Sequence, residues 1–168
     1  TMHLPVTDEV SAHVDPDLRG VLLGLVEVYQ RLGRGEEAIS CLERLRELEP
    51  EDVVVKLSLA ELLLEVGAGD EQARQKVVQL AEDIENETPV HTALLLYKAR
   101  ALRGLGLLIA ARETLTGALR RKKGRSDELL RALRYERALV YEDLGQRRRA
   151  RSELEKLYAE DPDYEDVA

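Results

Sequence analysis

Apolar residues recur along most of the chain at the three- and four-residue spacing of amphipathic helices, with charged residues between them. Glycine and proline interrupt this pattern at intervals that separate one apolar segment from the next. The pattern predicts eight helices, near residues 18–32, 35–48, 52–66, 70–85, 90–104, 108–123, 127–144 and 147–160.

Two of these helix starts carry explicit capping signals. Thr88 precedes Pro89, a pair typical of an N-cap followed by proline in the first helical turn. Ser126 precedes Asp127 and Glu128, and acidic residues are favoured beside the positive end of a helix. We therefore expect helices to begin at these two places.

The turn between two helices repeats along the chain. The segment "YQRLGRGEEAISCL", Tyr29 to Leu42, aligns without a gap with "YEDLGQRRRARSEL", Tyr141 to Leu154. Proline follows each segment at the same distance, as Pro50 and Pro162. Weaker copies contain Gly67 with Ala73 and Val77, and Gly106 with Ala111 and Leu115. The four turn glycines are Gly33, Gly67, Gly106 and Gly145, with spacings of 34, 39 and 39 residues.

This pattern predicts a repeated helical hairpin. The glycine ends the first helix in a left-handed conformation that costs other residues energy. The alanine five residues later lets the second helix approach the first closely, and the following leucine fills the space between them. A single hairpin cannot bury its own apolar face, so we expect neighbouring hairpins to stack.

On these residues the chain resembles the tetratricopeptide repeat family, whose period is about 34 residues. The resemblance is carried mainly by the first and fourth copies, with leucine in place of the family's Trp and Phe. It implies an all-α fold, a right-handed α-solenoid of about four helical hairpins. We expect a repeat domain over residues 18–168, with repeats near 19–52, 53–88, 89–125 and 126–164.

The N-terminal segment, residues 1–17, lies outside the repeat. Its apolar residues alternate with polar ones on either side of a short polar stretch, "TDE". Two interpretations follow: an extended leader, or a short β-hairpin that would have to dock on the first repeat or on a partner to be stable.

Composition supports a helical core and narrows the environment. The chain has 168 residues, 44% of them hydrophobic, with no Phe, no Trp and six Tyr, so that burial depends on Leu, Val and Ala. The single cysteine, Cys41, cannot form an internal disulfide. Because no apolar run is long enough to cross a membrane, we expect a cytoplasmic protein with no membrane contact.

Residues with catalytic or metal-binding spacing are missing from the sequence. None of the three histidines, His3, His13 and His91, lies three or four residues from another histidine or from Cys41, and His3 and His13 would come together only if the leader forms a hairpin. The glycines fall at helix ends and form no phosphate-binding motif. We therefore expect no enzyme activity, no cofactor and no metal site.

The resemblance implies that the first helix of each hairpin lines a concave groove where a peptide or partner helix docks. Within that groove Tyr97, Arg100, Arg103 and Tyr135 would form the most ligand-like group, because aromatic and arginine side chains dominate interface energies. Alternatively, the two tyrosines pack between adjacent hairpins. The groove candidates are Leu23, Glu27, Gln30, Leu57, Glu61, Leu96, Tyr97, Arg100, Arg103, Tyr135, Glu136, Leu139 and Glu142.

Charge is divided unevenly within a net charge of −8. Residues 1–90 hold 8 basic and 20 acidic side chains, whereas residues 91–168 hold 17 and 13. The basic surface candidates are Arg120, Arg121, Lys122, Lys123, Arg125, Arg147, Arg148, Arg149 and Arg151. These residues form either a polyanion-binding surface or a solvated outer face. Because no aromatic residues are interleaved with them for base stacking, we do not expect nucleic acid to be the partner.

These observations favour a non-enzymatic protein–protein interaction or scaffold module that binds an unidentified peptide or protein in the groove. Two alternatives stay open. One is a nucleic-acid or polyanion binder that uses the basic C-terminal half. The other is a self-association domain, a homo-oligomer in which the acidic half of one copy meets the basic half of another.

Overall fold

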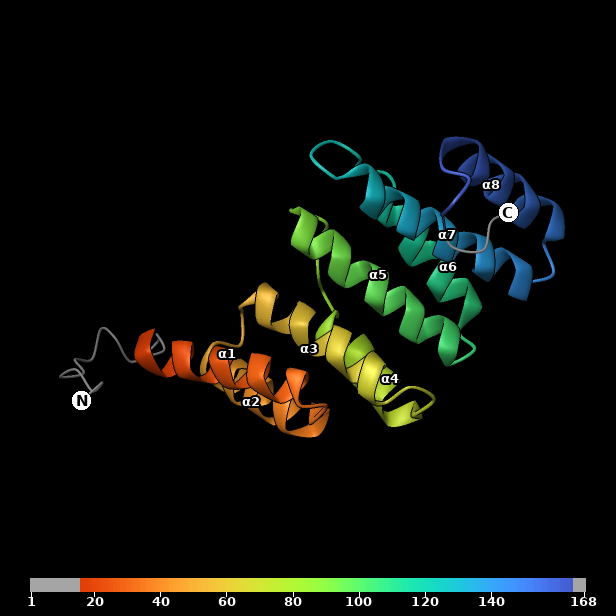
Figure 1. Cartoon of the computed structure of the whole chain (residues 1–168). Coiled ribbons are helices and arrows are strands. Elements are labelled where there is room, and N and C mark those ends of the chain that lie inside the picture. The colour runs from red at the N-terminus through yellow and green to blue at the C-terminus, as the bar shows by residue number, and fades with distance from the viewer. Residues whose placement is uncertain (1–15, 165–168) are drawn as a thin grey trace. The chain divides into compact units, whose positions relative to one another are not determined.

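The computed structural model describes residues 16–164, which form eight α-helices and no strand (Figure 1). The chain divides into two compact units, residues 1–68 and residues 69–168. The first unit contains α1 (Pro16–Arg31), α2 (Gly35–Leu48) and α3 (Val53–Val66). The second contains α4 (Glu71–Leu80), α5 (Pro89–Gly104), α6 (Leu108–Ala118), α7 (Asp127–Asp143) and α8 (Arg147–Glu160).

All eight predicted helices are present, and two of them end five residues earlier than predicted. Helix α4 ends at Leu80, and Asp83 just beyond it has a φ of 58°, which a helix cannot contain. Helix α6 ends at Ala118, whose carbonyl accepts a hydrogen bond from the Asn86 side chain instead of from a further helical turn. The proposed β-hairpin at residues 1–17 falls almost wholly outside the described residues, and the two that are described belong to α1.

Both predicted caps are confirmed. The Thr88 hydroxyl accepts a hydrogen bond from the backbone N–H of His91, whose ring in turn accepts from the Thr88 N–H, with Pro89 in the first turn. The Ser126 hydroxyl accepts from the Leu129 N–H at 3.1 Å. Each cap satisfies a backbone donor that the helix itself leaves unpaired.

The predicted left-handed glycines are confirmed at three of the four turns. Gly33, Gly106 and Gly145 have φ values of 71°, 78° and 80°. The prediction for Gly67 is wrong, since its φ is −95° and Gly69 adopts the left-handed conformation with a φ of 86°. The extra residue in this turn moves the reversal of the chain two positions further on.

In the first unit, α2 packs against both α1 and α3. Ala38, Leu42 and Leu45 of α2 are fully buried, as the small-residue contact predicted from the repeat requires. The start of α2 comes so close to the end of α3 that a Cβ atom on Gly35 would lie 2.3 Å from Val66 Cγ2. Any larger residue at this position would force the Val66 side chain or the helices to shift.

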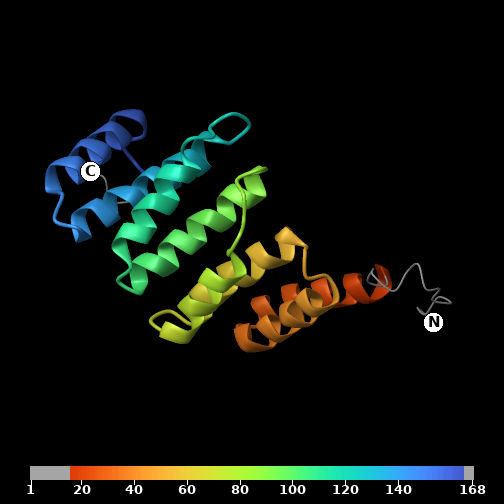
Figure 2. The same cartoon turned by 180° about the vertical axis from the view of Figure 1, so that it is seen from behind.

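The second unit contains two helical hairpins, α5 with α6 and α7 with α8, with α4 packed on α5 and α6 packed on α7 (Figures 1 and 2). Its main core brings together α5, α6 and α7. The predicted small and large residues of the second helices, Ala111 and Leu115, are fully buried there, beside Leu133 and Val140 of α7. Ala150 of α8 is buried as well, at 3% exposure.

Candidate functional site

Two arginines of α5 converge on one carboxylate of α7 in the second unit. Arg103 Nε donates to Glu136 Oε2 at 2.5 Å, and Arg100 Nε lies 3.5 Å from Glu136 Oε1. Arg103 also reaches Asp143 Oδ2 through Nη1 at 3.5 Å. The Arg100 guanidinium stacks over the Tyr97 ring, 5.1 Å from its centre. Four of the predicted groove residues, Tyr97, Arg100, Arg103 and Glu136, are thus brought together.

Glu136 is only 3% exposed, whereas the arginines that it binds are about one-third exposed. Burial lowers the pKa of the Arg103 guanidinium. Its hydrogen bond to Glu136 and the charges of Glu136 and Asp143 raise the pKa by more, so that it lies above the ordinary value. The two positive and two negative side chains balance, and the cluster has no net formal charge.

Tyr135 makes a different contact from Tyr97, although both were predicted to belong to the same ligand-like group in the groove. Its ring meets that of Tyr164 edge to face, with centres 5.7 Å apart and planes at 72°. Tyr164 follows α8, so this pair ties the middle of α7 to the segment after the last helix. Of the other candidates in this unit, Leu96 is buried, Leu139 is half-buried and Glu142 is exposed.

The remaining groove candidates belong to the first unit. Gln30 on α1 and Glu61 on α3 are exposed, as are Leu23 and Glu27. Glu27 forms an ion pair with Arg31 one helical turn later. Leu57 on α3 is half-buried.

The basic residues around α6 and α7 are partly committed to internal contacts. Arg125 donates to the Thr92 hydroxyl at 2.9 Å and to the Asn86 side-chain oxygen at 3.0 Å. Arg121 donates to the Asn86 backbone carbonyl at 2.7 Å. These contacts hold the connection between α6 and α7 against the connection between α4 and α5. Sequence analysis missed this network because its members lie 33 to 39 residues apart. The exposed basic residues nearby are Arg120, Lys122 and Lys123.

The arginines at the start of α8 differ from one another in their surroundings. Arg149 stacks over the Tyr141 ring at 5.7 Å, and Arg151 lies 3.4 Å from Glu155. Arg147 and Arg148 are exposed. Glu153, although it lies next to this run in sequence, faces α7 instead. Glu153 is 9% exposed and its Oε1 lies 3.1 Å from Arg137 Nη2 and 3.4 Å from Arg134 Nε, both on α7.

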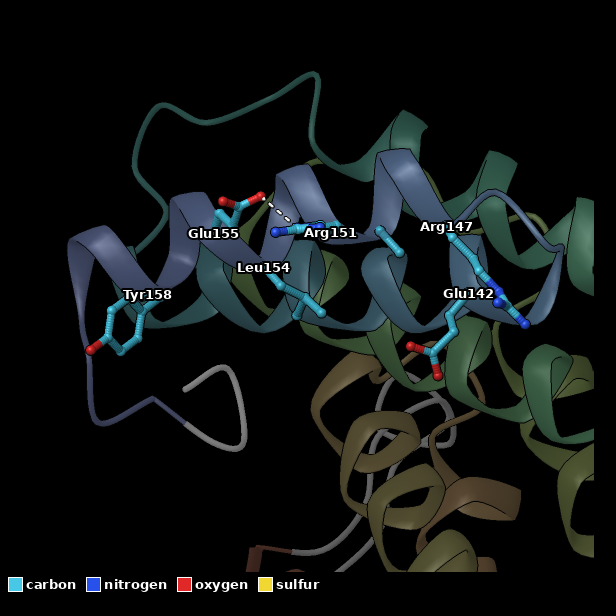
Figure 3. Close-up of a pocket in the computed structure, with 7 residues that line it drawn as sticks. Glu142, Arg147, Arg151, Leu154, Glu155 and Tyr158 are labelled. Carbon is cyan, nitrogen blue, oxygen red and sulfur yellow. Dashed lines mark ion pairs between the residues drawn. The ribbon is translucent and has the colours of Figure 1, made fainter.

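A groove of about 910 Å³ runs along one face of α8. Figure 3 shows Leu154 and Tyr158 pointing to the same side of the helix, with Glu142 of α7 and Arg147 at the other end. We call this surface the α8 groove, and its lining residues are Glu142, Arg147, Ala150, Arg151, Leu154, Glu155 and Tyr158. Sequence analysis assigned Ala150 and Leu154 to packing alone. The equivalent positions of the other repeats carry the sequence signal for this groove.

Within residues 16–164, no group of three or more His, Cys, Asp or Glu side chains is placed to hold a metal ion. Over the same part of the chain, no helix is both long and apolar enough to cross a membrane. Burial raises the pKa of the Cys41 thiol above its ordinary value, which leaves less thiolate at neutral pH.

The stacked hairpins, their left-handed glycine turns and their buried alanines define a helical-repeat protein. It is a tetratricopeptide repeat protein, since residues 19–62 and residues 131–164 each match the tetratricopeptide repeat family. The family indicates a protein–protein interaction or scaffold module. No match was found among curated proteins.

Solved structures share the helical fold. A putative kinesin light chain from Podosopora anserina, with nearly identical TPR-like repeats, is 25% identical with a TM-score of 0.63, over 89% of this chain and 76% of that one. TTC0263, a thermophilic TPR protein of Thermus thermophilus, is 24% identical with a TM-score of 0.52, over 86% and 75%. MamA is 18% identical with a TM-score of 0.63, over 83% and 75%.

Proposed function

We propose that this chain is a protein-interaction module whose partner, a peptide or protein segment, binds the face formed by α5 and α7 in the second unit. The observation that supports this most is the Tyr97–Arg100 stack, held in place by the buried Glu136 carboxylate. An aromatic ring and a guanidinium that are already ordered lose little conformational entropy when a partner binds. Such residues commonly contribute most of the binding energy at protein interfaces.

The charge balance of this cluster bears on the partner's chemistry. Glu136 and Asp143 already neutralise Arg100 and Arg103, so an acidic ligand would have to compete with them. The face therefore suits a segment that offers apolar surface to the Tyr97 ring and hydrogen-bond acceptors to the exposed edges of the guanidinium groups. A polyanion draws its affinity from many uncompensated cations. Because the two arginines of this cluster are already neutralised, the face favours a protein partner over nucleic acid.

Site-specific photocrosslinking tests the proposal. A photoreactive phenylalanine analogue replaces Tyr97 in one protein and Glu113, an exposed residue of α6, in a matched control. Both proteins are irradiated in lysate of the native organism, and crosslinked products are identified by mass spectrometry. We expect a discrete product at position 97 that is missing at position 113, and that Arg100→Gln weakens.

Identical products at the two positions, or none at position 97, would count against this face. A product at position 97 that Arg100→Gln leaves unchanged would show that the stacked arginine has no part in binding.

A further inference from the structure

The outward face of α8 carries apolar residues that other second helices bury. Ala150, Leu154 and Tyr158 follow one another at helical spacing along the α8 groove. Ala150 is covered by the hairpin itself, but Leu154 is only half-buried and Tyr158 is 47% exposed. The far side of this ridge therefore has no covering helix among the described residues.

Helix α6 shows how the same ridge is covered elsewhere. Counted from the turn glycines, Ala111, Leu115 and Leu119 occupy the positions of Ala150, Leu154 and Tyr158. All three are buried, with Leu119 at 6% exposure. The covering element is α7, which places Leu133 and Val140 in the same core cluster.

Helix α1 carries the complementary half of this contact, and no helix within residues 16–164 receives it. Counted back from Gly33, Val21, Val28 and Leu32 stand at the positions that Leu133, Val140 and Leu144 occupy in α7. Val21, Val28 and Leu32 are exposed by 43%, 47% and 62%, whereas Leu133 and Val140 are fully buried. The corresponding residues of α3 and α5, Val55, Leu62, Leu94 and Ala101, are all buried.

We propose that copies of this chain associate head to tail, with α1 of one copy seated in the α8 groove of another as α7 sits on α6. The occupant follows from two observations. The apolar positions of α8 match those of α6, and the apolar positions of α1 match those of α7. Helices α6 and α7 already pack on each other within the chain. The two halves of the chain that hold these helices also carry opposite net charge, since residues 1–90 hold 12 more acidic than basic side chains and residues 91–168 hold 4 more basic than acidic.

A single helix lying in a groove buries less surface than a standard interface, so we expect weak association in the micromolar range or above. The test is the mass of the full chain by light scattering and sedimentation equilibrium, from about 10 µM to about 1 mM. We expect the mass to rise with concentration from the monomer value of 18.9 kDa.

Two substitutions separate the faces. Val28→Glu places a charge in the α1 stripe and Tyr158→Glu places one in the α8 groove, both at exposed positions where the folded unit tolerates it. Each variant alone should associate at least about thirtyfold more weakly, as for a central interface residue. Each variant keeps one intact face, so an equimolar mixture of the two should form dimers of twice 18.9 kDa and nothing larger.

Ile109→Glu, at an exposed apolar position of α6 outside both faces, is the matched control and should associate as the wild type does. Circular dichroism of the three variants is the check that each is folded. A wild-type chain that stays monomeric at the highest concentration would overturn the proposal. So would a mixture that stays monomeric, or a Val28→Glu protein that associates as strongly as the wild type. Crosslinking at Tyr97 tests a different surface, so either proposal can fail without the other.

Discussion

Replacing Glu136 with glutamine removes the charge at the centre of the α5–α7 cluster while keeping the shape of the side chain. Arg103 then exchanges a carboxylate at 2.5 Å for a neutral amide oxygen, and Arg100 loses its nearby negative charge. Two guanidinium groups that are partly withdrawn from water are left without this counterion. We expect the second unit to lose stability.

The size of the loss follows from distance and burial. Two unit charges about 4 Å apart attract by about 4 kcal/mol at the effective dielectric constant of a protein surface. Arg100 and Arg103 are 38% and 33% exposed, so water screens much of this attraction. Neutralising Glu136 also recovers the cost of burying its charge. The net destabilisation should be about 1–2 kcal/mol, or roughly a 4–16 °C lower Tm for a unit of this size.

Urea unfolding followed by tyrosine fluorescence measures this change, because five of the six tyrosines lie in the second unit and the chain has no Trp. Glu142→Gln on the exposed side of α7 is the control and should shift the unfolding free energy by less than about 0.5 kcal/mol. An unchanged midpoint for Glu136→Gln, or an equal loss for Glu142→Gln, would show that the buried Glu136 charge does not stabilise the second unit.

Three further predictions concern packing, reactivity and the loop network. Gly35→Ala should destabilise the first unit by about 1–2 kcal/mol, because the new Cβ would meet Val66 Cγ2. The cost should largely disappear in a Val66→Ala background. Thermal midpoints of the wild type, the two single variants and the double variant measure both effects. Cys41 should react with Ellman's reagent at pH 8 about tenfold more slowly in the native chain than in urea, because burial raises its pKa; equal rates would contradict this. Asn86→Ala should lower the free energy of unfolding in urea by about 2–3 kcal/mol, because it removes the donor to the Ala118 carbonyl and an acceptor for Arg125. A loss below about 0.5 kcal/mol would show that these hydrogen bonds do not stabilise the connection.

The sequence predicted the local features of the fold well, because each has a local physical cause. A left-handed glycine, a capping hydroxyl and a small residue at a helix contact depend on a few neighbouring positions. For this reason Gly33, Gly145, Thr88 and Ser126 behave as predicted. The same reasoning failed at Gly67, where one added residue offered the turn a second glycine.

Features that depend on distant contacts were not predictable from the sequence. Glu136 was placed on the groove by analogy, but its burial depends on two arginines 33 and 36 residues earlier. The early end of α6 depends on Asn86, which lies 32 residues before Ala118. Tyr158 looks like a core residue by its position in the repeat, and only the absence of a covering helix among residues 16–164 makes it a surface residue.

The hydrogen bonds around Asn86 bear on how the second unit unfolds. In an array of repeats each hairpin contacts only its neighbours, so opening can begin at an end and progress one hairpin at a time. Asn86 joins the start of α5, the end of α6 and the connection before α7 through side chains, so fraying at any one of them breaks bonds in the others. The amide protons of these three segments should therefore exchange with solvent as one cooperative unit. The connection between α6 and α7 is therefore the point where the hairpins of the second unit are coupled.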